Sequence, residues 1–233
     1  MRTLESTMVI ASIHLADVGF FRSIRTRPPR RVEGLIHANV AQVVPLASSP
    51  LLIRRGRVGL VAFWDDDDAL DGFLADHPLA RRMAGGWHAR LEPLRAHGDW
   101  PGLPDDINRS RATTHEGPAV VLTLGRLRLS QARRFLRTSR PAEAAALEAP
   151  GLIWGTALAK PPFVATCSLW ESATSLSKYA YGQAQPAHPD AIAIDAAKPF
   201  HKQSSFIRFR PYRAEGSLGG LNPLVADALS ATS

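Results

Sequence analysis

Cysteine and long apolar runs are almost absent from the sequence, and each shortage excludes a class of protein. Cys167 is the single cysteine among 233 residues, so the chain can form no intramolecular disulfide and no site with several cysteine ligands. No apolar run approaches the roughly 20 residues that a membrane-spanning helix needs. The run Met8–Ile13 is short and is flanked by Glu5 and Asp17, which is not typical of a signal peptide. We therefore expect a cytoplasmic protein and leave peripheral membrane contact open.

Familiar nucleotide-binding and catalytic motifs are missing as well. The sequence contains no GxGxxG after a predicted strand, no P-loop, no GxSxG and no HExxH. Several chemistries that depend on these motifs can therefore be set aside. If the protein needs reducing equivalents, we expect them to come from an external reductase or ferredoxin.

The chain is basic, with 28 lysines and arginines against 21 acidic residues and a formal net charge of +7. These residues are dispersed except for the run Arg25–Arg31. A short arginine and proline run between apolar segments is typical of a solvated loop, and contact with phosphate or lipid headgroups is the alternative. We expect no nucleic-acid partner, because no strand combines aromatic and basic residues in the way that RNA-binding sheets do.

An internal duplication is present in the sequence. Gly34–Ile36 recurs 117 residues later as Gly151–Ile153, and Leu91–Leu103 recurs 118 residues later as Phe209–Leu221. Between these segments the two halves share further aromatic and apolar positions in the same order. A shared order at nearly constant spacing indicates that one structural unit is repeated.

Each half predicts a strand, a helix, two adjacent strands, a second helix and a last strand. The strands are expected at Val9–Ile13, Leu35–Leu46, Val58–Trp64 and Trp87–Arg95, and again at Val120–Leu124, Leu152–Ala159, Phe163–Trp170 and Ser204–Arg213. This order is the ferredoxin-like pattern, whose sheet has one face covered by helices and one face bare. Two copies can bury their bare faces against each other within one chain.

We therefore predict an α+β fold of duplicated ferredoxin-like units (βαββαβ twice), with the two antiparallel sheets packed as an intrachain dimeric α/β barrel. The first repeat is assigned to residues 1–105, a linker to 106–118 and the second repeat to 119–233. Because such a chain contains its own pseudo-dimer, both a monomer and a homodimer remain open.

Two helices carry informative local signals. Ser130–Leu147 is predicted as a helix with a break at Pro141, because proline removes a backbone donor and clashes with the preceding turn. The acidic run Asp65–Asp68 lies immediately before the predicted helix Ala69–Leu74. A metal site is one interpretation of these four aspartates, and capping of the helix N-terminus is the interpretation that we prefer.

The C-terminal half contains an ordered set of residues that resembles one known family. The set comprises Pro162–Val164, Ser168–Trp170, Tyr179–Ala180, Gly182, His188, Ala191–Ile192, Phe200, Arg208–Phe209, Gly216–Ser217, Gly220 and Asn222–Leu224. From Leu152 to Leu224 the sequence resembles the spheroidene monooxygenase family, with departures at Leu218 and at Gln183–Pro186. The resemblance implies a haem-dependent oxygenase that acts on acyclic carotenoids and binds haem iron in a ferredoxin-like barrel.

His188 is the predicted ligand of the haem iron. It precedes Pro189, a residue favoured at the first position of a helix, and a helix N-terminus disfavours a charged imidazolium. A neutral imidazole can ligate haem iron. The alternative is that His188 is only a boundary residue beside a proline, and the resemblance favours the ligand. His77 precedes Pro78 in the first repeat in the same way, so a second site there is a weaker alternative.

Arg208 is the predicted catalytic and cofactor-binding arginine. In the last strand Arg208 and Arg210 share one face, and Ile207 and Phe209 share the other. A guanidinium on this sheet could pair with a haem propionate or polarise oxygen bound to the iron. The alternative is an arginine that faces solvent.

Trp154, Phe163 and Trp170 are the predicted walls of an apolar substrate pocket, with a purely structural role in the core as the alternative. Cys167 lies in the middle of a predicted strand among aliphatic residues. A thiolate ligand for iron would need a more basic setting, so we interpret Cys167 as a buried, inert thiol.

Three functions are compatible with this sequence. The first is a haem-dependent monooxygenase that inserts oxygen into an apolar polyene such as an acyclic carotenoid. The second is a haem protein with other chemistry, such as a dehydratase, a peroxidase-like enzyme or a haem-degrading enzyme. The third is a binding module without a cofactor. The first is our prediction, and binding of haem separates it from the third.

Overall fold

The computed structural model describes residues 8–47, 56–110, 114–181, 198–218 and 222–224. The first half contains β1 (Ile10–Asp17), α1 (Phe20–Arg25), β2 (Leu35–Val44), β3 (Arg57–Trp64), α2 (Asp67–Asp76), α3 (Pro78–Met83) and β4 (Trp87–Gly98). The second half contains β5 (Ala119–Leu127), a 3₁₀ turn (Leu129–Gln131), α4 (Ala132–Leu147), β6 (Leu152–Lys160), β7 (Phe163–Trp170), α5 (Ala173–Tyr181) and β8 (His201–Gly216).

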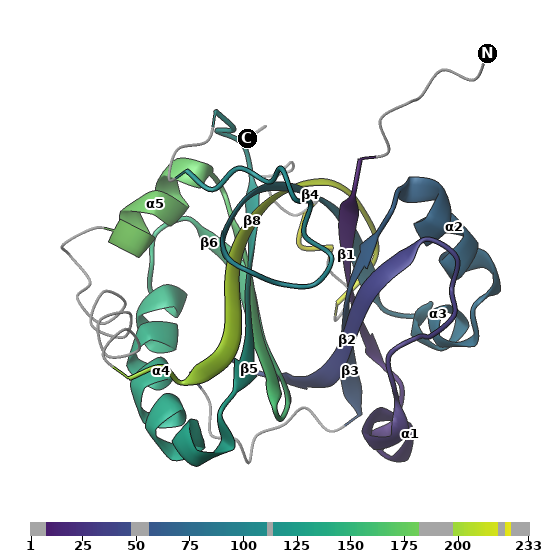
Figure 1. Ribbon diagram of the computed structural model, residues 1–233, viewed down its shortest axis with the longest axis horizontal. Coiled ribbons are helices and arrows are strands. Elements are labelled where there is room, and N and C mark those ends of the chain that lie inside the picture. Colours follow the sequence, from purple (N-terminus) through teal and green to yellow (C-terminus); the bar gives the residue numbers. More distant parts are fainter. Residues whose placement is uncertain (1–7, 48–55, 111–113, 182–197, 219–221, 225–233) are drawn as a thin grey trace.

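The strands form one closed antiparallel barrel in the order β1-β3-β2-β6-β7-β5-β8-β4. Each half therefore contributes a four-stranded ferredoxin-like sheet, and the pairs β2–β6 and β4–β8 join the two sheets. In Figure 1 the helices α1, α2 and α3 cover one side of the barrel and α4 and α5 cover the other. The predicted α+β fold, a duplicated ferredoxin-like chain closed as an intrachain α/β barrel, is confirmed.

Side chains on alternate strand positions separate an inner core from two outer layers. The inner face of both sheets fills the barrel with apolar residues, including Phe63, Leu122 and Phe209, each of which is fully buried. Outside the first sheet, Trp64 and Phe73 belong to the layer beneath α2 and α3. The outer layer of the second sheet is smaller and is built around Trp170 and Leu176.

The segment after β4 packs into one end of the barrel. Trp100 is 1% exposed and Ile107 is 7% exposed, and both belong to the barrel core. Gly102 has a φ of +96°, and a Cβ there would lie 2.6 Å from the side chain of Phe63. Glycine is therefore required where this segment crosses the barrel. The division at residues 105 and 118 into repeat, linker and repeat remains a prediction.

The helix signals in the sequence had different outcomes. Asp66 caps α2 by accepting a hydrogen bond from the backbone N–H of Ala69 at 2.9 Å, so the preferred capping interpretation is confirmed for this aspartate. The predicted break at Pro141 is wrong, because α4 continues through this residue. Pro141 and Arg137 are both exposed, so water can solvate the carbonyl of Arg137 that loses its helical donor.

Within the part of the chain that the structure describes, every helix is too short or too polar to cross a bilayer.

Candidate active site

A cavity of about 430 Å³ lies between the outer face of the second sheet and the helices α4 and α5. Its sheet side consists mostly of small residues: Val121, Thr123, Gly125, Ala157, Ala159, Val164, Thr166 and Ser168. Its helical side is lined by Phe135, Leu136, Ser139, Arg140, Ala142, Glu143, Ala146, Leu176, Tyr179 and Ala180. A cavity of this size with few polar groups suits an apolar small molecule or a planar cofactor.

Comparison of the two repeats shows why the second sheet leaves this space. In the first repeat, His14 of β1 pairs with Leu60 of β3 on the outer face, and both side chains are buried. The equivalent cross-strand pair in the second repeat is Thr123 of β5 with Thr166 of β7. Two short side chains therefore replace a ring and a branched chain. The missing bulk becomes open volume, because the helix does not collapse onto the sheet.

His201 presents an imidazole to the cavity, at the start of β8. The ring makes an edge contact with Phe135, with centroids 5.2 Å apart, and another with Phe200 at 6.3 Å. It also lies directly over Gly125, where a Cβ would be 2.5 Å from the imidazole Cδ2. Glycine at position 125 therefore leaves the room that this ring occupies. The sequence prediction missed His201, which has no proline beside it and no histidine at the matching position of the first repeat.

Glu143 supplies a carboxyl group to the cavity wall and connects the two repeats. Its Oε2 accepts a hydrogen bond from the backbone N–H of Ala47, at a distance of 2.7 Å. Burial raises the pKa of Glu143 above its ordinary value, and the hydrogen bond from Ala47 opposes this shift. The carboxyl can therefore hold a proton at a higher pH than an exposed glutamate can.

Trp170 and Tyr179 form the end of the cavity next to α5. Their rings stack with centroids 5.0 Å apart, and the Trp170 Nε1–H donates to Ser168 Oγ at 2.9 Å. The Tyr179 hydroxyl donates to the carbonyl of Ala142 at 2.9 Å. Burial and the nearby carboxyl of Glu143 raise the pKa of Tyr179 to about 12, so this phenol remains protonated at neutral pH.

The structure separates the three aromatic residues that were predicted to share a pocket. Trp170 lines the cavity, whereas Phe163 and Trp154 belong to the barrel interior. Phe163 packs near Trp100 at 5.9 Å between centroids, and Trp154 packs near Trp87 at 5.7 Å. Strand parity is the physical reason, since Phe163 and Trp170 stand seven positions apart on β7 and therefore point to opposite faces.

Arg208 lies on the outer face of β8 beneath α5 and beside the cavity. It is 2% exposed, which excludes the alternative of an arginine that faces solvent, and its Nη2 donates to Ser177 Oγ at 3.3 Å. Its neighbour in the sheet register is Val121, which lines the cavity, although Arg208 itself does not. The expected faces are correct, because Ile207 and Phe209 point into the barrel.

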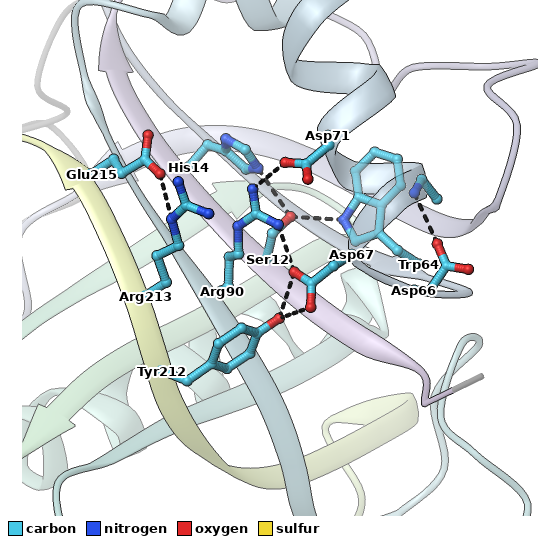
Figure 2. Close-up of polar contacts among 11 residues, drawn as sticks. Ser12, His14, Trp64, Asp66, Asp67, Asp71, Arg90, Tyr212, Arg213 and Glu215 are labelled. Atoms are coloured by element: carbon cyan, nitrogen blue, oxygen red, sulfur yellow. Dashed lines mark hydrogen bonds and ion pairs between the residues drawn. The ribbon is translucent and has the colours of Figure 1, made fainter. Parts of the chain in front are cut away.

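The first repeat shows which partner this buried position accommodates. Arg90 occupies the equivalent place on β4 and forms ion pairs with Asp67, at 2.5 Å, and with Asp71 (Figure 2). The matching positions on α5 are Ala173 and Ser177. Where the first repeat has two carboxylates, the second therefore has a methyl group and a hydroxyl.

The other candidates can be placed individually. His188 lies outside the described residues, so its role as iron ligand remains a prediction. His77 caps α3, because its Nδ1 accepts the backbone N–H of Leu79 at 3.1 Å. Cys167 is 1% exposed inside the barrel, and burial raises the pKa of its thiol well above the ordinary value. The interpretation of Cys167 as a buried, inert thiol agrees with this environment.

Known proteins resemble this chain in sequence. No family model matches the chain. It is 30% identical over 166 residues to a spheroidene monooxygenase of Rubrivivax gelatinosus, which covers 69% of this chain and 62% of the relative. It is 26% identical over 184 residues to a spheroidene monooxygenase of Rhodobacter capsulatus, which covers 73% of this chain and 72% of the relative. The match thus spans less than two thirds of the Rubrivivax protein.

Two solved structures resemble the barrel at very low sequence identity. One is an aldoxime dehydratase in complex with butyraldoxime, with a TM-score of 0.54 and 8% identity over 89% of this chain and 81% of the other. A second aldoxime dehydratase has a TM-score of 0.52 and 9% identity over 90% and 83% of the two chains. At these identities the likeness concerns the fold alone. The sequence similarities show that the chain resembles spheroidene monooxygenases over about 70% of its length, as its C-terminal half predicts.

Proposed function

We propose that the chain is a haem-dependent monooxygenase that inserts oxygen into an apolar polyene such as an acyclic carotenoid. The observation that carries this proposal is the apolar cavity of the second repeat, with an imidazole on its wall, in a relative of the spheroidene monooxygenases. A polyene has no charges to recognise, so an apolar cavity wall is the feature that its binding needs.

The residues around the cavity suit a haem group. His201 offers an imidazole nitrogen as a ligand within the described part, and Arg140 offers a cation at the exposed surface of α4. The predicted ligand His188 belongs to residues 182–197, which connect Ala180 and His201 along the chain, and both of these residues line the cavity. His188 lies outside the described residues and stays a predicted ligand beside His201.

Arg208 has a defined part in this proposal. The Arg90 site shows that a buried arginine at this position accommodates carboxylates, and a haem propionate is a carboxylate. We propose that Arg208 pairs with a propionate and thereby sets the orientation of the cofactor. The polarisation of bound oxygen by Arg208 stays a second prediction for the same side chain.

The remaining cavity residues would orient the substrate and control protons. Haem, when bound, supplies the capacity to activate oxygen. The apolar residues around Trp170, Leu176 and Val164 exclude water and hold a polyene against the sheet. Glu143 can hold a proton at its carboxyl oxygen inside this apolar space. Electrons would come from an external reductase or ferredoxin.

An oxygenation assay with isotopically labelled dioxygen tests this function. The haem-loaded protein, a ferredoxin, its reductase and an acyclic carotenoid should yield a product that contains the label. The double variant Thr123→His, Thr166→Leu, which has His and Leu as at the matching positions of the first repeat, should lose the product because the cavity is filled. Cys167→Ala changes the residue next to Thr166 on β7, whose side chain points into the barrel and away from the cavity, and should retain activity. Product formation by the filled variant would contradict a reaction in this cavity.

A further inference from the structure

Helix α1 presents its large apolar side chains to solvent and its small polar side chain to the protein. Phe20 is 49% exposed, Phe21 is 72% exposed and Ile24 is 57% exposed, whereas Ser23 is buried. A helix that packs on a soluble domain normally does the reverse. Adjacent exposed side chains of this size form a patch, which is the feature that marks an interaction surface.

The backbone around α1 keeps this orientation in place. The Ser23 hydroxyl donates to the carbonyl of Phe20 at 2.7 Å, so the buried polar group is satisfied within the helix. The N–H of Val18 donates to the carbonyl of Gly56 at 2.8 Å. A Cβ on Gly56 would lie 3.2 Å from the backbone of Gly19 and Phe20, so the chain segments approach closely there. The outward position of the phenylalanines is therefore a fixed feature of the fold.

Positive charge lies on α1 and on the segment that follows it. The exposed arginines are Arg22 and Arg25 of α1 and Arg27, Arg30 and Arg31 of the segment between α1 and β2. None of these five forms an ion pair with a carboxylate among the described residues. The nearby Asp17 is engaged by Arg57 at 2.6 Å. The surface therefore combines aromatic and aliphatic groups with arginines that form no ion pair within the described part of the chain, and this is the combination that anionic membrane interfaces bind.

The same end of the barrel connects to the cavity. Lys160, at the end of β6, donates a hydrogen bond to the carbonyl of Thr26 immediately after α1, at 2.8 Å. Its neighbours Ala159 and Pro161 both line the cavity. Figure 1 shows α1 at the lower end of the molecule, where β5 also ends. The residue after α1 is therefore hydrogen-bonded to Lys160, whose neighbours in the chain form part of the cavity wall.

We infer that α1 and its arginines dock the protein onto the surface of an anionic phospholipid bilayer. Phe20, Phe21 and Ile24 would enter the boundary between headgroups and acyl chains, and the arginines would contact the phosphates. The exposed apolar groups favour a bilayer over an acidic protein, whose interface would pair mainly with the charges. This docking needs neither haem nor turnover, so it stands or fails separately from the proposed function.

Sedimentation with vesicles tests the inference directly. The wild-type full chain should pellet with vesicles of phosphatidylcholine mixed with phosphatidylglycerol and remain mostly in solution with pure phosphatidylcholine. Phe20→Ser with Phe21→Ser should weaken binding by about tenfold or more, because two exposed rings no longer enter the bilayer. Arg25→Gln with Arg27→Gln should weaken binding by roughly tenfold or more at low salt.

Matched controls separate this surface from general stickiness and charge. Leu147→Ser removes an exposed apolar residue at the end of α4, and Arg81→Gln with Arg82→Gln removes two exposed arginines from α3, which is also a short helix. Both controls should pellet like the wild type. Equal losses in the controls and in the α1 variants would overturn the assignment to α1, as would a wild type that stays in solution with anionic vesicles.

A fluorescent reporter checks the depth of insertion. Phe21→Trp places an exposed indole on α1, whereas Trp64, Trp87, Trp100 and Trp170 of the native chain are buried and Trp154 is partly buried, so the difference from the wild-type spectrum reports on position 21. Its emission should shift to the blue with anionic vesicles, and lipids with brominated acyl chains should quench it. Binding without a blue shift or quenching would show that α1 stays outside the bilayer and would contradict the inference.

Discussion

The contact between His201 and Gly125 allows one substitution to test the geometry of the cavity. In Gly125→Ala, the new Cβ would lie 2.5 Å from Cδ2 and 2.7 Å from Nε2 of His201. Ordinary contact begins near 3.4 Å, so the ring must retreat by roughly 0.9 Å. The φ of Gly125 is not positive, so alanine adds no backbone strain of its own.

The size of the effect follows from the packing around the ring. Phe135 and Phe200 hold the imidazole by edge contacts, so its retreat disturbs a packed cluster. Overpacking of this kind costs about 1–3 kcal/mol. For a chain of this size that cost lowers the melting temperature by roughly 2–4 °C per kcal/mol. Functional groups must be held to within about 0.5 Å, so hemin affinity should also fall, by about tenfold or more if His201 is the ligand.

Thermal unfolding and a hemin titration of the same variant provide the assay. Gly72→Ala is the matched control, because a Cβ at this exposed helical glycine meets no atom within 4 Å. It should be stabilised by about 0.5–1 kcal/mol and should bind hemin as the wild type does. If Gly125→Ala melts and binds hemin like the wild type, the ring of His201 does not lie over Gly125, and the account of the cavity wall is refuted.

Three further predictions concern buried polar groups. Asp67→Ala with Asp71→Ala should lower the free energy of unfolding in urea by about 2 kcal/mol, a value kept small because both carboxylates are partly exposed. Adding Arg90→Met to this pair should recover most of the loss, because no buried charge is then left without a partner. Burial, followed by the charges of His88 and Arg90, lowers the pKa of His14 to about 3. The unfolded chain therefore takes up a proton between pH 6.5 and 3, so the free energy of unfolding should fall as the pH drops through this window, and His14→Gln should flatten the fall. Cys167 should react with a thiol reagent only after unfolding, and reaction in the native protein would contradict its burial.

Much of the fold was readable from the sequence because its strands have strong local signals. Phe163–Trp170 was predicted with the bounds that the structure shows, since β-rich residues and turn residues mark both ends. The faces of β8 were also predicted, because side chains alternate regardless of tertiary context. Pro141 was misjudged because its effect depends on whether water reaches the carbonyl that it leaves without a donor.

The site was harder to predict because it depends on which side chains of each strand face the barrel interior and which face the helices. Trp154, Phe163 and Trp170 are all apolar, and the sequence does not tell whether each faces the barrel or the helices. The burial of Arg208 comes from α5, which lies above it. The cavity itself comes from an absence of bulk at Thr123 and Thr166, which becomes visible only when the two repeats are superimposed by register.

The most direct test of the central claim is a titration of the purified apo-protein with hemin, followed in the Soret region. The account predicts stoichiometric binding with a sharp Soret band in the wild type. It also predicts that this band is lost in one of the two folded variants His188→Ala and His201→Ala, and that the Thr123→His, Thr166→Leu variant does not bind. If the wild type binds no hemin, or if the filled variant binds it as tightly as the wild type, the cavity of the second repeat is not a haem site.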